Sequence, residues 1–223
     1  MTDESDLPIV DPSAVTEHTN SPSDLPPVAG VVLAAGMSSR FGESNKLLAM
    51  IDGEPLVRHA LRSFLDSGLT PVFVVVGHES QAVREAVGGT GATVIDAPEY
   101  EQGQSVSVGA GTAAAAETNA VAAVFLPGDM PFVDPATIRT LISVYDAGVG
   151  DALAPAFDGR RGNPVLFDRR HFDKLRRIEG DVGGRRVLLE SDEAALVAVE
   201  DNGIQIDVDT QAQLAQQRQN RDD

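Results

Sequence analysis

Residues 28–46 read VAGVVLAAGMSSRFGESNK, and they decide the fold because a short apolar run passes directly into a loop of small, hydroxylated and cationic residues. The run from Val28 to Leu33 is long enough for a buried strand. An amphipathic helix pattern begins near Pro55. We therefore expect the loop to leave the carboxyl end of the first strand of an α/β unit, where such folds bind ligands.

This loop contains the groups that a polyphosphate needs. Gly36 and Gly42 offer bare backbone N–H groups, Ser38 a hydroxyl, and Arg40 and Lys46 fixed positive charge. The alternative is that both cations are ordinary surface residues. The chain has 17 Lys and Arg against 34 Asp and Glu, a net charge of −17, with neither Lys nor Arg before Arg40. Such scarce positive charge favours a specific anion site.

Composition limits the class of protein. The 223 residues suit one α/β domain, and no apolar run approaches the ~18 residues of a membrane span. The acidic start MTDESDLPIV is unlike a secretory signal, and the absence of cysteine excludes disulfides and thiolate sites and is compatible with a cytoplasmic location. The acid excess argues against non-specific binding to nucleic acid or membrane. It also suggests a halophile, in which concentrated salt would screen self-repulsion.

Alternating strands and helices predict a mostly parallel sheet covered on both faces. We expect strands at 28–33, 71–76, 92–95, 121–126, 151–157, 163–167, 195–199 and 204–208. We expect helices at 55–65, 79–87, 104–117 and 135–145, near 170–177 and 183–190, and from 210 onward. Residues 1–27 are predicted to be a flexible acidic tail, residues 28–216 the domain, and residues 217–223 a frayed C-terminus. The hairpin and short helices after residue 150 would form an insertion that builds the far wall of a cleft.

Two acidic segments are candidates for binding Mg²⁺. Asp129 follows a buried strand, at the same edge of the sheet as the Gly36 loop, although Pro-Gly-Asp is also a turn signature. Asp207 and Asp209 lie two residues apart and would share one face of a strand. Asp209 could equally cap the final helix. Asp134, before a proline, is expected to cap a helix rather than to touch a ligand.

Further candidates surround the expected cleft. Arg161, Gly162 and Asn163 form a cationic turn that could clamp a second anionic substrate or be a solvated hairpin. Gly103 and Ser105 begin a helix whose N–H groups could hold an anion or be simply capped. Gly180 and Asp181 open another glycine-rich loop with the same two interpretations.

Several familiar motifs are absent. The sequence contains neither GxxxxGK[ST] nor GxGxxG, so a Walker NTPase and a simple Rossmann dehydrogenase lose support. It has no GxSxG elbow. His59, His78 and His171 lack a triad context or metal-ligand spacing, and we treat them as non-catalytic.

Taken in order, these segments resemble the MobA-like nucleotidyltransferases, most closely the molybdenum cofactor cytidylyltransferases. The resemblance runs from Val28 to about Gln216. It is carried by seven segments: Leu33-Ala34-Ala35-Gly36-x-Ser38-x-Arg40-Phe41-Gly42 with Asn45-Lys46-Leu47-Leu48; Asp52 to Leu56; Tyr100 to Ser105; Pro127 to Pro131; Arg161 to Phe167; Gly180-Asp181-x-Gly183-Gly184-Arg185; and Asp207-x-Asp209-Thr210.

The resemblance implies a Rossmann-like, three-layer α/β/α fold and Mg²⁺-dependent transfer of a nucleotidyl group from an NTP. Arg40 and Lys46 would bind the triphosphate, and Asp129, with Asp209, the metal. The Ala34-Ala35-Gly36 form of the loop is similar to that of CTP users. The acceptor would be molybdopterin and the partner a molybdoenzyme. Gly162-Asn163-Pro164 stands where cytidylyltransferases often have Gly-His-Pro, and it is the one departure from the pattern.

Other functions remain open from the sequence. A related nucleotidyltransferase could use a sugar phosphate or phospholactate as acceptor. A non-catalytic chaperone would bind molybdopterin without releasing pyrophosphate. A small reductase related to the family would oxidise NAD(P)H.

Overall fold

The computed structural model describes residues 4–15, 25–38, 40–42, 44–180 and 183–222. Their centre is a nine-stranded sheet with the strand order β1-β11-β8-β10-β7-β2-β5-β6, and β9 pairs with β8 beside this path. Its strands are β1 (Ile9–Val10), β2 (Val28–Ala34), β5 (Val72–Val76), β6 (Thr93–Asp96), β7 (Ala122–Pro127), β8 (Ala152–Phe157), β9 (Arg160–Arg161), β10 (Val165–Asp168) and β11 (Ala194–Ala198). A separate two-stranded sheet joins β3 (Met50–Ile51) to β4 (Glu54–Pro55).

The sheet is mostly parallel, as predicted. β2 runs parallel to β5 and β7, and β11 runs parallel to β1 and β8. Only β10 and β9 run against their neighbours, because the chain turns back in the hairpin region after residue 150. β10 therefore joins the two parallel halves of the sheet.

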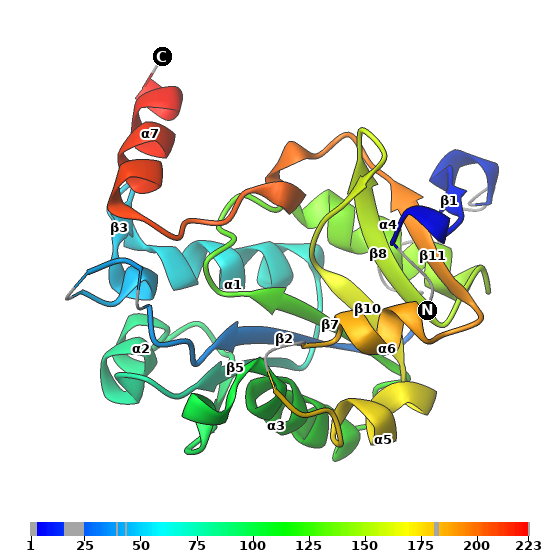
Figure 1. The fold of residues 1–223 in the computed structure, drawn as a ribbon, viewed down its shortest axis with the longest axis horizontal. Coiled ribbons are helices and arrows are strands. Elements are labelled where there is room, and N and C mark those ends of the chain that lie inside the picture. The colour runs from blue at the N-terminus through cyan, green and yellow to red at the C-terminus, as the bar shows by residue number, and fades with distance from the viewer. Residues whose placement is uncertain (1–3, 16–24, 39, 43, 181–182, 223) are drawn as a thin grey trace.

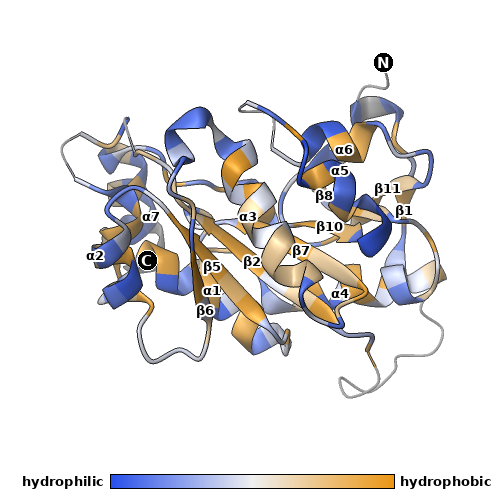
Figure 2. Ribbon diagram, turned by 90° about the horizontal axis from the view of Figure 1, so that it is seen from below, coloured by the Kyte–Doolittle hydropathy of each residue, from blue (hydrophilic) through white to orange (hydrophobic). Residues whose placement is uncertain are grey.

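Helices cover both faces of the sheet and make a three-layer sandwich (Figure 1). The α-helices are α1 (Leu56–Ser67), α2 (Ser80–Ala86), α3 (Gln104–Ala116), α4 (Pro135–Asp146), α5 (Phe172–Leu175), α6 (Arg185–Leu189) and α7 (Gln211–Asp222). The core cluster on one face takes its helical members from α1, α2 and α4, and the cluster on the other face from α3, α5 and α6. Figure 2 shows β2 and β5 as predominantly hydrophobic, as burial on both faces requires.

The remaining short elements are 3₁₀ turns at η1 (Glu4–Asp6), η2 (Pro12–Ala14), η4 (Lys46–Leu48), η5 (Tyr100–Gln102), η6 (Arg169–His171) and η7 (Asn202–Gln205). The last of these corrects the strand expected at 204–208. The Asp201 side chain accepts a hydrogen bond from the backbone N–H of Gly203 and starts a tight turn. Gly203 also packs so closely that an added Cβ would lie 2.1 Å from the Phe132 carbonyl oxygen.

The described residues near each end of the chain include regular elements that the sequence did not predict there. Residues 4–15 were predicted to belong to a flexible tail, yet β1 pairs in parallel with β11 and Leu7 is buried against the core. Residues 1–3 and 16–24 of that predicted tail lie outside the described residues. The predicted frayed end also differs, because α7 continues to Asp222 and is anchored by buried Leu214 and by Arg218, whose Nε donates to the Met50 carbonyl over 3.0 Å.

No helix among the described residues is long and apolar enough to cross a membrane.

A buried carboxylate ties the hairpin region together. Asp151, just before β8, accepts a hydrogen bond from Ser191 Oγ over 2.5 Å and lies 2.9 Å from His171 Nε2 and 3.4 Å from Arg170 Nη1. Burial alone would raise the pKa of Asp151, but the Ser191 and His171 contacts and the Arg170 charge outweigh it and lower this pKa from its usual value. The carboxylate is therefore charged at neutral pH.

Replacing Asp151 with asparagine is expected to lower the free energy of unfolding by about 1–3 kcal/mol, because the groups around this buried carboxylate lose its negative charge and one of its hydrogen-bond acceptors. Since its pKa is lowered in the folded state, this contribution is present above the unfolded-state pKa and is lost as pH falls through the folded value. Urea unfolding at neutral and at strongly acid pH measures the difference between wild type and variant, which should shrink in acid. Glu193→Gln is the matched control, because Glu193 is an exposed ion-pair partner of Arg170. This substitution should lower the free energy of unfolding by less than Asp151→Asn does. Equal costs for both variants would contradict the prediction.

Candidate active site

A cavity of about 340 Å³ opens at the carboxyl edge of β2 and β7. Its walls come from the loop after β2, from the turn after β7, from the segment before α3 and from the segment before α7. The predicted residues Leu33, Ala35, Gly36, Ser38 and Gly103 line it, together with the four charged candidates Arg40, Lys46, Asp129 and Asp209. The four charged side chains come from three segments that are far apart in the sequence, so the fold brings together what the motifs only suggested.

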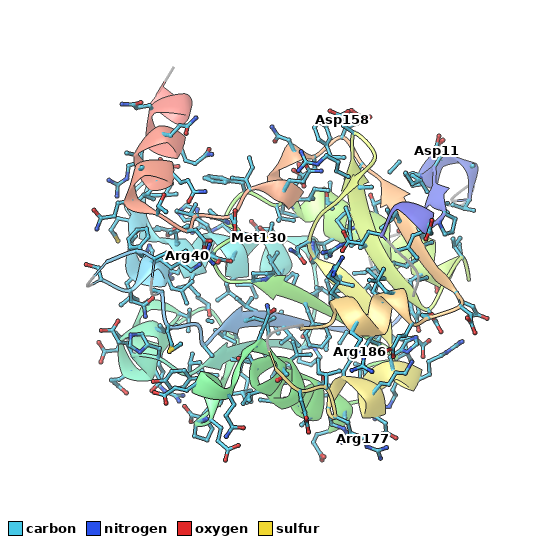
Figure 3. The ribbon with its side chains drawn as sticks, in the orientation of Figure 1. Asp11, Arg40, Met130, Asp158, Arg177 and Arg186 are labelled. Atoms are coloured by element: carbon cyan, nitrogen blue, oxygen red, sulfur yellow. The ribbon has the colours of Figure 1, made fainter. Side chains whose placement is uncertain are left out.

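Lys46 is the centre of the charged cluster. Its Nζ contacts Asp129 Oδ2 and lies 2.6 Å from Asp209 Oδ1. Arg40 Nη1 lies 2.5 Å from the other oxygen of Asp209, and the Arg40 side chain is 77% exposed, against 14% for Lys46. One cation is thus held inside the cavity while the other reaches out at its rim, where Figure 3 shows Arg40.

The electrostatics of the cluster favour the charged forms of Lys46 and Asp209. Burial would lower the pKa of Lys46, but the adjacent Asp129 and Asp209 carboxylates outweigh it and raise that pKa. Burial would likewise raise the pKa of Asp209, but Lys46 and Arg40 lower it. The pKa of Asp207 is raised by burial and by the charges of Asp209 and Asp129.

The two carboxylates suit a divalent cation that also binds phosphate. Asp129 Oδ1 is buried and has no hydrogen-bond partner, which leaves one charged oxygen in the cluster unsatisfied. No group of three or more acidic or histidine side chains among the described residues could hold a metal alone. Mg²⁺ commonly uses one or two carboxylates and completes its shell with water and substrate phosphates. Asp129 and Asp209 therefore fit this ion, with the rest of its ligands coming from outside the protein.

Asp209 does not cap α7. Instead, the Thr210 hydroxyl accepts from the Gln213 backbone N–H over 3.2 Å, and this leaves Asp209 to the cavity. The Val208 N–H donates to the Asp129 carbonyl over 2.9 Å, which fixes the two acidic segments side by side. Asp134 caps α4 as predicted, accepting from the Ala136 N–H over 2.7 Å.

The loop after β2 is shaped by contacts that the sequence did not reveal. Ser38 has a positive φ of 54°, and its hydroxyl accepts from the Lys46 N–H over 3.2 Å and lies 3.3 Å from Asn45 Oδ1. Buried Asn45 accepts from the Leu47 N–H and caps η4. The Ser38 hydroxyl thus positions Lys46 in addition to facing the cavity. Capping residues before a short turn are a recognisable signal, so Asn45 could have been found.

Three predicted nucleotide residues do not line the cavity. Ala34 is wholly buried in β2, and Gly42 supports the loop with a φ of 90°. The Ser105 N–H, which was expected to face an anion, donates to the Gly180 carbonyl over 3.1 Å. That bond docks the Gly180 loop on the start of α3, so Gly180 has a structural contact of its own.

A second cavity of about 370 Å³ adjoins the first. Both cavities include Leu33, Gln104 and Pro127 in their walls. Arg161 and Asn163, predicted to bind the acceptor, line this second cavity, whereas Gly162 and Gly180 do not. Asp181 lies outside the described residues. Arg185, which belongs to the Gly180 segment of the resemblance but was not assigned a binding role from the sequence, also lines the cavity.

Comparison with known proteins places this geometry in a family. Residues 30–195 match the MobA-like NTP transferase domain. Nicotine blue oxidoreductase from Paenarthrobacter nicotinovorans is 30% identical over 86% of this chain and 97% of its own length. CMP-5′-(3-aminopropyl)phosphonate synthase from Streptomyces rubellomurinus is 42% identical, but over 32% of this chain and 12% of its own length.

A solved structure supports the same assignment. Rv0371c from Mycobacterium tuberculosis is 26% identical, with a TM-score of 0.73 over 87% of this chain and 99% of that protein. Its complex with manganese is also known. The chain belongs to the MobA-like NTP transferase family of nucleotidyltransferases.

Proposed function

We propose that this protein transfers CMP from CTP to the phosphate of a molybdopterin-type acceptor, with Mg²⁺, and releases pyrophosphate. The observation that carries the proposal is Lys46, held between Asp129 and Asp209 inside a cavity whose rim bears Arg40. A site with two cations and two carboxylates can bind a triphosphate together with a divalent ion.

The base and the acceptor rest on separate support. CTP is favoured by the Ala34-Ala35-Gly36 form of the loop and by the similarity of one stretch to CMP-5′-(3-aminopropyl)phosphonate synthase. An acceptor bound beside the nucleotide is favoured by the second cavity, which shares walls with the first and has Arg161 in its lining. Molybdopterin is favoured by the family resemblance of the later motifs, and a molybdoenzyme would be the client.

The chemistry requires charge neutralisation more than proton transfer. A phosphate acceptor is already anionic, so it needs no strong general base, and no histidine is among the described residues that line either cavity. Lys46, whose pKa is raised, keeps its proton and can stabilise charge on the phosphates, while Arg40 reaches them from the rim. Mg²⁺ bound by Asp129 and Asp209 would supply Lewis-acid neutralisation of phosphate charge.

A screen of the four common NTPs for pyrophosphate release, with and without reduced molybdopterin, tests the proposal. We expect release with CTP, only when both molybdopterin and Mg²⁺ are present. The assay belongs in concentrated KCl, because we also propose that a net charge of −17 reflects a salt-rich cytoplasm. Pyrophosphate release with a sugar phosphate or phospholactate, and not with molybdopterin, would show that the proposed acceptor is wrong. Tight molybdopterin binding without release under every condition would contradict catalysis and support the chaperone.

One relative favours a second candidate. This chain matches nicotine blue oxidoreductase over 97% of that protein's length, so a reductase built on this fold is a specific alternative. It predicts oxidation of NAD(P)H by the purified protein with a quinone-like or dye-like acceptor. Oxidation of NAD(P)H without any pyrophosphate release from the NTPs would favour this candidate over nucleotidyl transfer.

A further inference from the structure

Two arginines line the second cavity, and both form ion pairs with a glutamate of the protein's own N-terminal segment. Glu4, in η1, accepts hydrogen bonds at Oε1 from Arg161 Nε over 2.8 Å and from Arg185 Nε over 2.6 Å. The three residues come from η1, from β9 and from the start of α6. A single carboxylate oxygen is therefore bound by two guanidinium groups that also line the cavity.

This contact is partly shielded from water. The exposed fractions of the side chains are 18% for Arg161, 29% for Glu4 and 52% for Arg185. Burial would raise the pKa of Glu4, but the hydrogen bonds and charges of Arg185 and Arg161 outweigh it and lower that pKa. Glu4 is thus ionised at neutral pH and acts as a bound anion.

The segment that carries Glu4 is tethered to the sheet a few residues away. Ile9 and Val10 form β1 beside β11, the Pro8 carbonyl accepts from the Leu196 N–H over 2.8 Å, and Leu7 is buried. Figure 1 shows the N-terminal end of the described chain beside α6 and β11. A ligand held by so short a tether has an effective concentration in the millimolar range. Only the η1 turn has to move for Glu4 to leave the arginines.

We propose that Arg161 and Arg185 form a subsite for an anionic oxygen group, phosphate or carboxylate, of the acceptor, and that Glu4 is a tethered competitor that the acceptor displaces. This inference deepens the proposed function and rests on its assignment of the second cavity to an anionic acceptor. Guanidinium groups match the geometry of phosphate and carboxylate oxygens. Glu4 demonstrates that complementarity with a carboxylate.

The competitor has a measurable consequence for affinity. While Glu4 occupies the arginines, any free anion must first displace it, so the apparent affinity of the subsite is the intrinsic affinity multiplied by the fraction of molecules whose arginines are free. Removing the charge while keeping the shape, with Glu4→Gln, should strengthen binding of inorganic phosphate at the two arginines by about tenfold. Removing a negative charge elsewhere on the protein should leave phosphate binding at the two arginines unchanged.

The experiment is an NMR titration of the Arg161 and Arg185 Nε–H signals with inorganic phosphate, at constant ionic strength, on the full chain. Wild type, Glu4→Gln and Asp11→Asn are compared. Asp11 is the matched control because it lies on the same N-terminal segment, carries the same charge and caps its own turn through the Ser13 N–H. Figure 3 shows Asp11 on the opposite side of the molecule from Arg40. A parallel titration with acetate tells a phosphate subsite from a carboxylate subsite.

Tighter phosphate or acetate binding in Glu4→Gln alone, abolished when Arg161→Gln is added, supports the proposal. Equal affinity in wild type and Glu4→Gln overturns it, and so does an equal gain in Asp11→Asn, which would reveal a general charge effect. The measurement needs no turnover. If Glu4→Gln gains phosphate affinity but no NTP yields pyrophosphate, the subsite stands and the proposed function fails. If pyrophosphate is released but affinity is unchanged, only the subsite fails.

Discussion

Replacing Lys46 with alanine is expected to lower the rate of nucleotidyl transfer by about 10²–10³, the scale of one lost preorganised electrostatic contact. Lys46 is the buried cation of the cavity, and no other Lys or Arg side chain among the described residues contacts both Asp129 and Asp209. Without Lys46, less of the negative charge on the nucleotide phosphates would be neutralised, so an anionic acceptor would be repelled more strongly. Turnover of the variant under saturating CTP and Mg²⁺ measures the loss.

The same variant separates a role in catalysis from a role in holding the site together. In the structure Lys46 occupies the carboxylates that a metal would use, so Lys46→Ala should bind Mn²⁺ at least as tightly as wild type, as measured by electron paramagnetic resonance. Lys174→Ala is the matched control, because the chain has only these two lysines and the Lys174 side chain is 51% exposed. Unchanged turnover in Lys46→Ala would remove Lys46 from the mechanism.

Replacing Asp129 with asparagine is expected to lower transfer by about 10³, or about 4 kcal/mol of transition-state stabilisation. Asp129 contributes the one oxygen of the cluster that is buried without a partner. An amide in its place removes the negative charge that a metal needs and leaves the side-chain volume unchanged. Turnover, together with Mn²⁺ affinity by the same resonance method, measures the effect, and both should fall.

Asp134→Asn provides the control for the Asp129 variant. Asp134 lies five residues further along, caps α4 and is exposed, and asparagine caps a helix about as well as aspartate. Its turnover should match that of wild type. An Asp129→Asn protein that keeps its Mn²⁺ affinity would show that the metal, if it binds, uses other ligands.

The centre of the fold could be predicted from the sequence because its strands are continuous apolar runs. β2, β5 and β7 lie within one residue of the expected ranges, since burial on both faces leaves a strong local signal. β1 has two residues and exists only through its pairing with β11, so nothing local marks it. The apolar spacing at 204–208 imitated a strand, and it was overridden by the Asp201 cap and the tight packing of Gly203.

The candidate site was predictable to the level of which side chains reach one edge of the sheet. Lys46 and Asp129 follow β2 and β7, which are neighbours, and parallel strands bring their carboxyl ends together. The pairing of Lys46 with both carboxylates could not be read from spacing, because Asp209 arrives on a segment after η7. The Glu4 contact was hidden for the same reason, as 157 and 181 residues separate it from its two arginines.

The pairing of β1 with β11 constrains the order in which contacts can form while the chain is being synthesised. β1 can pair only after its sheet partner at residues 194–198 has been synthesised. The half built from β2, β5 and β6 can collapse earlier, since its strands lie closer together in sequence. Glu4 can therefore contact both arginines only after residue 185 has been synthesised, later than the part of the sheet made by β2, β5 and β6 can form.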